Sequence, residues 1–282
     1  MTVMPIRRNM KFNLDPSRIN SWSGRGKHVT LFLNTLSTFF PEGERFFIDS
    51  LRNYRSEITE PELQEAVRNF IGQEAMHGRE HDEYNDAMAA AGLNTKSHEA
   101  QVTWLLKSMQ KFFPKSSQLG GTIALEHMTA LMGDFILRHK EIFENADPTY
   151  RDIWLWHAYE ETEHKGVAYD AWLATQDDSM LAYANRIGTF ALAMGLFWPL
   201  VTAYYLSNLR KEKGLTDIRG WMTMGHFLFN RKSGMFTTLF SEALDYLRRD
   251  FHPWDHDNSD LLRELDALAD LYEQKPPKKK TA

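Results

Sequence analysis

The stretch WHAYEETEHKG, residues 156–166, carries two histidines and three glutamates. In an α-helix, which turns about 100° per residue, His157, Glu161 and His164 lie within about 60° of one another. Glu163 then points almost to the opposite side. A charged stripe of this kind often belongs to a solvated helix face, but these residue types are also those of a metal site. Partners elsewhere in the chain distinguish the two interpretations.

A second stretch, FIGQEAMHGREH at residues 70–81, repeats the same spacing. Glu74 and His77 stand three residues apart and His81 follows four residues later, so all three share one helical face, whereas Glu80 points away. A single Glu-x-x-His pair occurs often by chance. Its presence in two separate long segments is much less frequent and favours a shared site.

Two further glutamates lie in otherwise apolar helical segments. Glu126 stands in IALEHMTALMGDF (123–135), where a buried carboxylate must be paired or bound to a metal. The adjacent His127 points elsewhere and is interpreted as structural. Glu44 stands in TLSTFFPEGERFFIDSL (35–51), with Glu42 as the competing candidate.

One Glu followed by one Glu-x-x-His therefore occurs twice along the chain. In a four-helix bundle this pattern forms a two-metal site bridged by carboxylates. Four carboxylates carry a charge that neutralises two divalent cations, and imidazole with carboxylate suits iron or manganese better than calcium or magnesium. The set is Glu44, then Glu74 and His77, then Glu126, then Glu161 and His164.

Over about residues 40–170 these motifs resemble the ferritin-like di-iron carboxylate superfamily. Within it, FPEGERFF, QEAMHGREH, ALEHMTA and YEETEHK resemble a bacterial family described as predicted metal-dependent hydrolases. His157 gives a further similarity, to the p-aminobenzoate N-oxygenases, in which an extra histidine on the last helix completes seven ligands. The resemblance implies the ligands Glu44, Glu74, His77, Glu126, His157, Glu161 and His164. His81 departs from that pattern, and it could be a ligand, a proton carrier or a group behind the ligands.

The remaining sequence is also helical in pattern, without sustained period-two alternation. The prediction is an all-α fold, a ferritin-like four-helix bundle with additional C-terminal helices, in one domain. The bundle spans about 28–175, the extension about 178–273, and a basic tail at 275–282 is expected to be disordered. Helices are expected over 29–54 with a break at Pro41, 59–92 with a capping box at Thr59, 118–143, 147–174, 216–230, 233–250 and 258–273.

Residues 187–209 form a run of 23 residues without a charge, long enough to span a bilayer. Pro199 near its middle and four hydroxyl or amide side chains favour a buried or subunit-interface helix, in a soluble homodimer. Membrane contact and a true span are the alternatives.

Composition excludes several function classes. The chain of 282 residues has no cysteine, which rules out disulfides, zinc–thiolate sites and thiol nucleophiles. A net charge of −5 gives no reason to expect nucleic acid. The N-terminus lacks the apolar segment of a secretory signal, so a cytoplasmic location is expected, with membrane association possible.

The preferred functional prediction is a non-haem di-iron enzyme, an O2-dependent oxygenase or oxidase of an apolar small molecule. It requires two iron ions, with manganese possible, and an external electron donor. A dinuclear metal-dependent hydrolase is the alternative, and metal storage is a third class. The apolar substrate is inferred from the aromatic and methionine side chains near the motifs, Phe46, Phe47, Phe70, Met76 and Met132.

Overall fold

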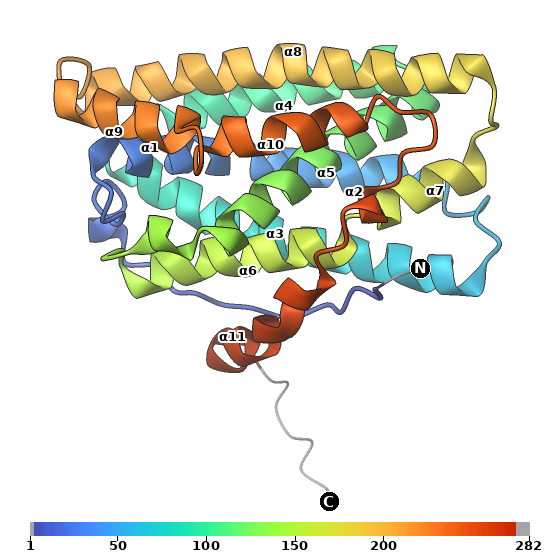
Figure 1. Ribbon diagram of the computed structural model, residues 1–282, viewed down its shortest axis with the longest axis horizontal. Coiled ribbons are helices and arrows are strands. Elements are labelled where there is room, and N and C mark those ends of the chain that lie inside the picture. The colour runs from blue at the N-terminus through green and yellow to red at the C-terminus, as the bar shows by residue number, and fades with distance from the viewer. Residues whose placement is uncertain (1–2, 275–282) are drawn as a thin grey trace, which may run out of the picture.

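The computed structural model describes residues 3–274 and is helical almost throughout (Figure 1). Within these residues no β-strand forms, and one isolated bridge joins Met10 to Glu273. The predicted all-α class is confirmed. The tail at 275–282, expected to be disordered, lies outside the described residues.

Four helices carry the motifs, in the order predicted. They are α2 (Phe40–Arg52), α3 (Pro61–Ala90), α5 (Lys115–Arg138) and α6 (Pro148–His164). Helix α2 packs against α3, and α5 packs against α6, so the motif-bearing faces meet inside the bundle (Figure 1).

The helix starts match the sequence signals in part. Asp147 caps α6, because its side chain accepts hydrogen bonds from the backbone N–H groups of Thr149 and Tyr150. The capping box expected at Thr59 is wrong: Glu60 is the N-cap residue of α3 and makes no side-chain capping bond. Pro61 nevertheless occupies the first turn, where its missing N–H costs nothing.

Two expected helices are each divided in two. The 29–54 segment forms α1 (Lys27–Ser37) and α2, and the break precedes Pro41, which lies in the first turn of α2. The 147–174 segment forms α6 and α7 (Val167–Thr175). Between them stands Gly166, where an added Cβ would lie 2.6 Å from the Trp254 indole nitrogen. The C-terminal segment therefore approaches the chain closely at this break.

Helix α4 (Thr95–Phe112) was not predicted. Only three of its residues, Thr95, His98 and Val102, are buried, so its apolar positions give a weak periodic signal. It lies behind α8 in Figure 1.

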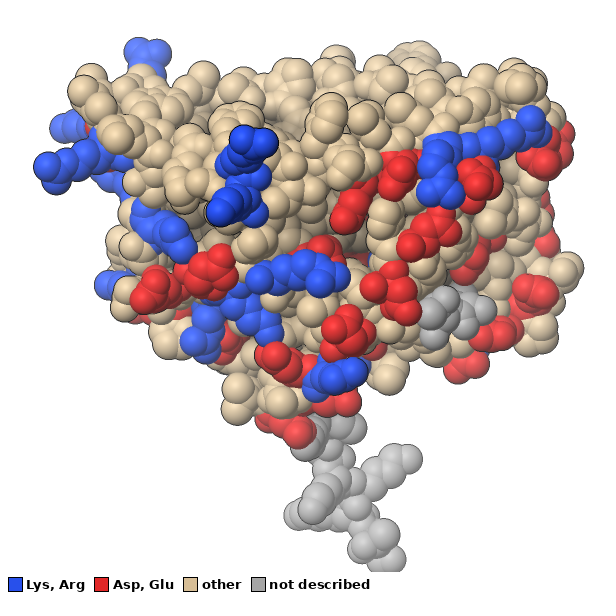
Figure 2. Space-filling model, in the orientation of Figure 1, with Lys and Arg blue, Asp and Glu red and all other residues tan. Residues whose placement is uncertain are grey.

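Helix α8 (Met180–Lys211) contains the uncharged run, for which a buried or subunit-interface helix was expected; the described residues do not bury it, and the interface remains a prediction. Only 22% of its most apolar 18-residue stretch is buried. By length and composition, α8 is the one helix in residues 3–274 that could cross a membrane. Its inward side is partly polar: Arg186, Thr189 and Asn208 are buried. Figure 2 shows an almost uncharged surface over the upper part of the molecule, where Figure 1 places α8.

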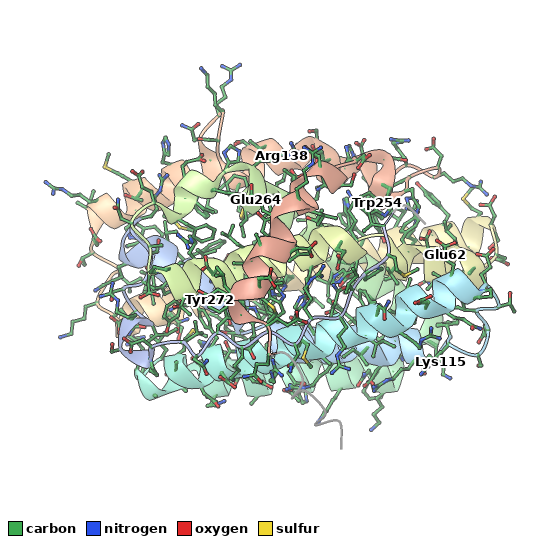
Figure 3. The ribbon with its side chains drawn as sticks, turned by 90° about the horizontal axis from the view of Figure 1, so that it is seen from below. Glu62, Lys115, Arg138, Trp254, Glu264 and Tyr272 are labelled. Carbon is green, nitrogen blue, oxygen red and sulfur yellow. The ribbon has the colours of Figure 1, made fainter. Side chains whose placement is uncertain are left out.

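The C-terminal helices confirm the expected segments with shorter bounds. They are α9 (Ile218–Phe229), α10 (Met235–Asp245) and α11 (Leu265–Tyr272), the last preceded by a 3-10 helix at Ser259–Glu264. The segment carrying Trp254, Glu264 and Tyr272 crosses the lower side of the bundle (Figure 3). There Tyr272 donates a hydrogen bond to Asp152 of α6.

Candidate metal centre

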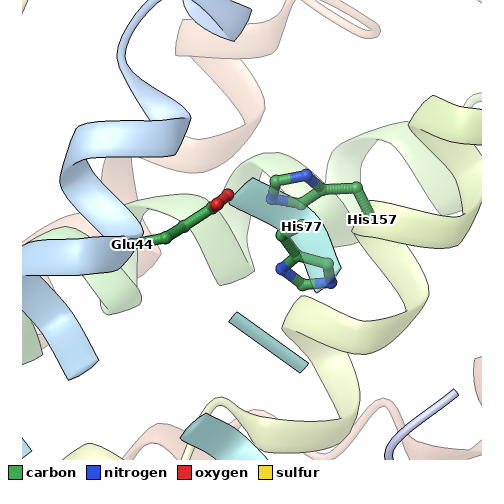
Figure 4. Close-up of side chains that lie close together, drawn as sticks. All are labelled: Glu44, His77 and His157. Atoms are coloured by element: carbon green, nitrogen blue, oxygen red, sulfur yellow. The ribbon is translucent and has the colours of Figure 1, made fainter. Parts of the chain in front are cut away.

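All seven residues expected to be ligands come together in the middle of the bundle. They form two groups. Within each group the ligand atoms lie within 4.8 Å of one another, so each group could hold a metal ion. Every member is buried. The first group is Glu44, His77 and His157, drawn in Figure 4, and the second is Glu74, Glu126, Glu161 and His164.

The two groups share a boundary at Glu161. Its Oε1 lies 3.1 Å from His157 Nε2 and 3.7 Å from His77 Nδ1, in the first group. Its Oε2 lies 3.5 Å from His164 Nε2, in the second. A carboxylate with one oxygen toward each group has the position of a bridging ligand.

Many of these atoms have no hydrogen-bond partner in the part of the chain that the structure describes. Buried acceptors left in this state cost free energy, so the cluster requires a cation or protons. The atoms are both carboxylate oxygens of Glu44, Glu74 and Glu126, Glu161 Oε2, His77 Nδ1 and His164 Nε2.

Two outer residues fix which nitrogen of each Glu-x-x-His histidine faces inward. His77 donates its Nε2–H to Glu160, at 3.1 Å, and His164 donates its Nδ1–H to the Gln73 side-chain oxygen, also at 3.1 Å. Glu160 and Gln73 each immediately precede the glutamate of the opposite motif, so the two helices hold each other's histidine. The inward nitrogens are therefore lone-pair donors, as metal ligation requires.

His81 lies behind His157 rather than in either group. The Ser37 hydroxyl donates to Asn85 Oδ1 at 2.8 Å, so it accepts from His81 Nδ1, also at 2.8 Å. His81 Nε2 is then an acceptor, and His157 Nδ1 donates to it at 2.8 Å. His157 Nε2 consequently presents a lone pair toward Glu161. This geometry favours His81 as a group behind the ligands that orients His157, which is one of the three roles left open by the sequence.

Arg8 was not predicted from the sequence; it comes from the N-terminal segment and is 5% exposed. Its guanidinium donates to both oxygens of Glu163, at 2.9 and 3.2 Å, and lies 3.5 Å from Glu160. Glu163 also accepts from Gln73 at 2.5 Å. Glu160 and Glu163, which a surface stripe would expose, are therefore buried supports of the site. The feature of the sequence that could have indicated their role is the cluster of glutamates just before His164.

Burial shapes the ionisation of the cluster. It raises the pKa of Glu44, Glu74 and Glu126 well above the usual carboxyl range. Burial also acts to raise the pKa of Glu161; when His164 and His157 are protonated, their charge and hydrogen bonds outweigh burial and hold that pKa well below its usual range. The carboxyls with raised pKa hold protons unless a cation replaces them.

Two alternatives raised by the sequence are decided by position. Glu42 is only partly buried and pairs with Arg45 at 2.6 Å, so it does not enter the cluster, whereas Glu44 does. His127 is buried and stacks on Tyr246 with ring centroids 5.2 Å apart, in agreement with a structural role.

An apolar cavity of about 90 Å³ lies next to the first group. Glu44, His157 and Glu161 line one part of it, and mainly apolar residues of α2, α4, α5 and α8 line the rest. Of the residues proposed to face a substrate, Phe46, Phe47 and Met132 contribute to this wall. Phe70 instead packs edge-on against His164, and Met76 belongs to the core.

Buried glutamates and histidines gathered in this way inside a helical bundle could hold metal ions. The chain belongs to the family described as predicted metal-dependent hydrolase, whose model matches residues 6–257. The match includes Arg8 and all seven residues of the two groups. No curated protein and no solved structure was found to match.

Proposed function

We propose that this protein is an enzyme whose two groups of side chains bind two metal ions and which hydrolyses an apolar ester or amide. The observation that carries the proposal is the convergence of three imidazole lone pairs with four carboxylates. Iron or manganese fits this nitrogen and oxygen donor set. The arrangement also supports the resemblance to ferritin-like di-iron carboxylate proteins.

The donor set fits two divalent cations on charge as well as geometry. Four glutamates would supply four negative charges, and each of the three histidines turns a ring nitrogen toward the centre because Glu160, Gln73 and His81 hold the other one. When bound, such a pair of ions lowers the pKa of a water between them and polarises a substrate carbonyl. The chain's part is to hold the donors, exclude bulk water and bind the apolar portion of the substrate.

The family description supports hydrolysis over oxidation. O2-dependent oxidation of an apolar substrate is the second candidate, and one observation favours it: the cavity wall is almost wholly apolar apart from the cluster residues. A dry wall offers few groups to orient a polar leaving group, whereas it suits the oxidation of a hydrocarbon. Oxidation would require iron and an external electron donor.

Metal content tests the site. We expect two ions per chain, and Glu44→Gln should lose one of them because it removes a carboxylate from the first group. Glu42→Gln is the matched control, since it changes the same residue type two positions away on α2 and should keep both. Equal metal content in the two variants would remove Glu44 from the site, and a single ion in the wild-type protein would end the two-metal proposal.

Reaction type is tested with the metal-loaded wild-type protein. Nitrophenyl esters of increasing acyl length should be cleaved by the manganese-loaded or iron-loaded protein, and Glu44→Gln should abolish cleavage while Glu42→Gln retains it. Absence of cleavage, together with O2 consumption by the Fe(II)-loaded protein, would replace hydrolysis with the oxidative candidate.

A further inference from the structure

One face of the molecule is apolar, and residues 3–274 leave it uncovered. It is formed by α4, α8, α9 and α10, and we call it the apolar face. Four large side chains on it, from α4, α9 and α10, are each between 66 and 74% exposed: Trp104, Ile218, Met222 and Phe240. An exposed apolar surface built from several helices marks a site of interaction with another protein or with a membrane.

The charges that border this face are basic, although the chain as a whole is acidic. Within residues 95–115 and 180–245, Asp217 is the one exposed acidic residue. The exposed basic residues of the same ranges are Lys96, Lys107, Lys111, Lys115, Arg210, Lys211, Lys213, Arg219, Arg231 and Lys232. In Figure 2 most of the acidic side chains lie below, on the lower half of the visible side. A surface of this charge complements anionic lipid and repels a second copy of itself.

Helix α8 is held to the bundle and therefore lies along the face instead of projecting from it. Arg186 donates to the Tyr169 hydroxyl at 2.7 Å, and Asn208 donates to Thr35 at 3.1 Å. A transmembrane orientation would break both contacts and place a guanidinium in hydrocarbon. An apolar helix fixed in this way is suited to lie in the plane of a membrane interface.

The apolar face also leads to the metal centre. A groove of about 340 Å³ runs between α8 and α10, and Phe240 lies on its rim. Met128 and Met132 line this groove and also the cavity beside the cluster. Two flexible methionine side chains therefore stand between the surface and the site, and their rotamers can open a path for a narrow chain.

We infer that the apolar face docks on an anionic lipid bilayer and that a lipid acyl chain enters the α8–α10 groove toward the metal centre. The docking depends only on the face. The entry of the acyl chain rests on the function proposed above and names its substrate class as an acyl lipid.

Vesicle flotation of the full chain tests the docking without any catalytic assay. We expect binding to vesicles of equal parts phosphatidylcholine and phosphatidylglycerol, and much weaker binding to phosphatidylcholine alone. Each basic residue near an anionic surface contributes about fivefold, so Arg231→Glu with Lys232→Glu should weaken binding by at least about 20-fold. Arg55→Glu with Arg68→Glu makes the same charge change on α3 and its preceding loop and should leave binding unchanged. Equal effects of the two pairs would overturn docking through this face.

The absence of cysteine permits a test of orientation. Met222→Cys and Leu271→Cys, at side chains 71 and 72% exposed, each receive an environment-sensitive fluorophore. Vesicles should shift the emission of the label on α9 to the blue and leave the label on α11 unchanged. Equal shifts, or a lipid-independent dimer that protects the α9 label, would overturn the proposal, the latter in favour of a second copy on this face.

Acyl-chain entry has its own readout. Ala243→Trp fills the α8–α10 groove from the α10 side, away from the cluster, and should abolish binding of a fluorescent fatty acid while metal content and vesicle docking stay unchanged. Retained fatty-acid binding in this variant would overturn the entry route. If the metal-loaded wild-type protein binds the fatty acid but cleaves no ester, that result would count against the proposed function alone.

Discussion

Arg8 provides the sharpest test of how the metal centre is supported. Its guanidinium is buried, donates to both oxygens of Glu163 and lies beside Glu160, which in turn holds His77. Arg8→Met keeps the volume of the side-chain stem but leaves two buried carboxylates without their cation. Removing one partner of a buried pair costs about 3–5 kcal/mol. Glu163 keeps hydrogen bonds from Gln73 and from the Ile6 backbone, so we expect the lower end, about 3 kcal/mol.

The assay is urea unfolding of the metal-free protein, with metal titration as a second readout. Burial already raises the pKa of Glu160 to about 8 although Arg8 acts to lower it, so loss of Arg8 would raise that pKa further, favour the protonated carboxyl and weaken its hold on His77. Loss of such a supporting contact should reduce metal affinity by about 10–100-fold.

Arg151→Met is the matched control. Arg151 pairs with Asp152 at 2.7 Å, and its own side chain is 43% exposed. Asp152 is buried but keeps the hydrogen bond from Tyr272, so loss of Arg151 should cost about 1 kcal/mol and leave metal affinity unchanged. The reasoning is refuted if the two variants lose the same stability, or if Arg8→Met binds metal as tightly as the wild-type protein.

Three further outcomes follow from single positions. Gly133→Val should destabilise the protein by about 1–3 kcal/mol in urea unfolding, because an added Cβ meets a backbone oxygen of α6 at 3.0 Å, whereas Gly188→Val, with nothing within 4 Å, should not. Burial lowers the pKa of His98 from 6.5 to about 4, so its contribution to stability is lost as pH falls from 6.5 through 4. Between about pH 7 and pH 5, the free energy of unfolding should therefore fall less in His98→Phe than in the wild-type protein, and an equal fall in both would contradict the lowered pKa. Ser37→Ala removes the hydroxyl that orients His81 and should weaken binding of one of two metal ions about tenfold, which calorimetric titration would detect.

The sequence by itself determined the helical class and the seven central residues. Helical periodicity is a local property, and a ligand stripe on one face, such as Glu161 with His164, can be read without knowing its neighbours. The doubled motif also indicated which helices must meet, because four isolated buried acids would be too costly apart. The choice of Glu44 over Glu42 was open from the sequence and followed from the fold, since only Glu44 faces the other motifs.

Tertiary structure alone decided the supports of the site and the surface of the C-terminal helices. Arg8 is 155 residues from Glu163 in sequence, and no local pattern reports a contact of that separation. The burial of Glu160 and Glu163 likewise depends on what packs against the far side of α6. For α8, composition indicated a buried or interface helix, and within residues 3–274 most of its apolar surface has no partner. The hydrophobicity of a segment predicts that something covers it, whereas only the packing of the whole chain shows which apolar surfaces the protein leaves exposed.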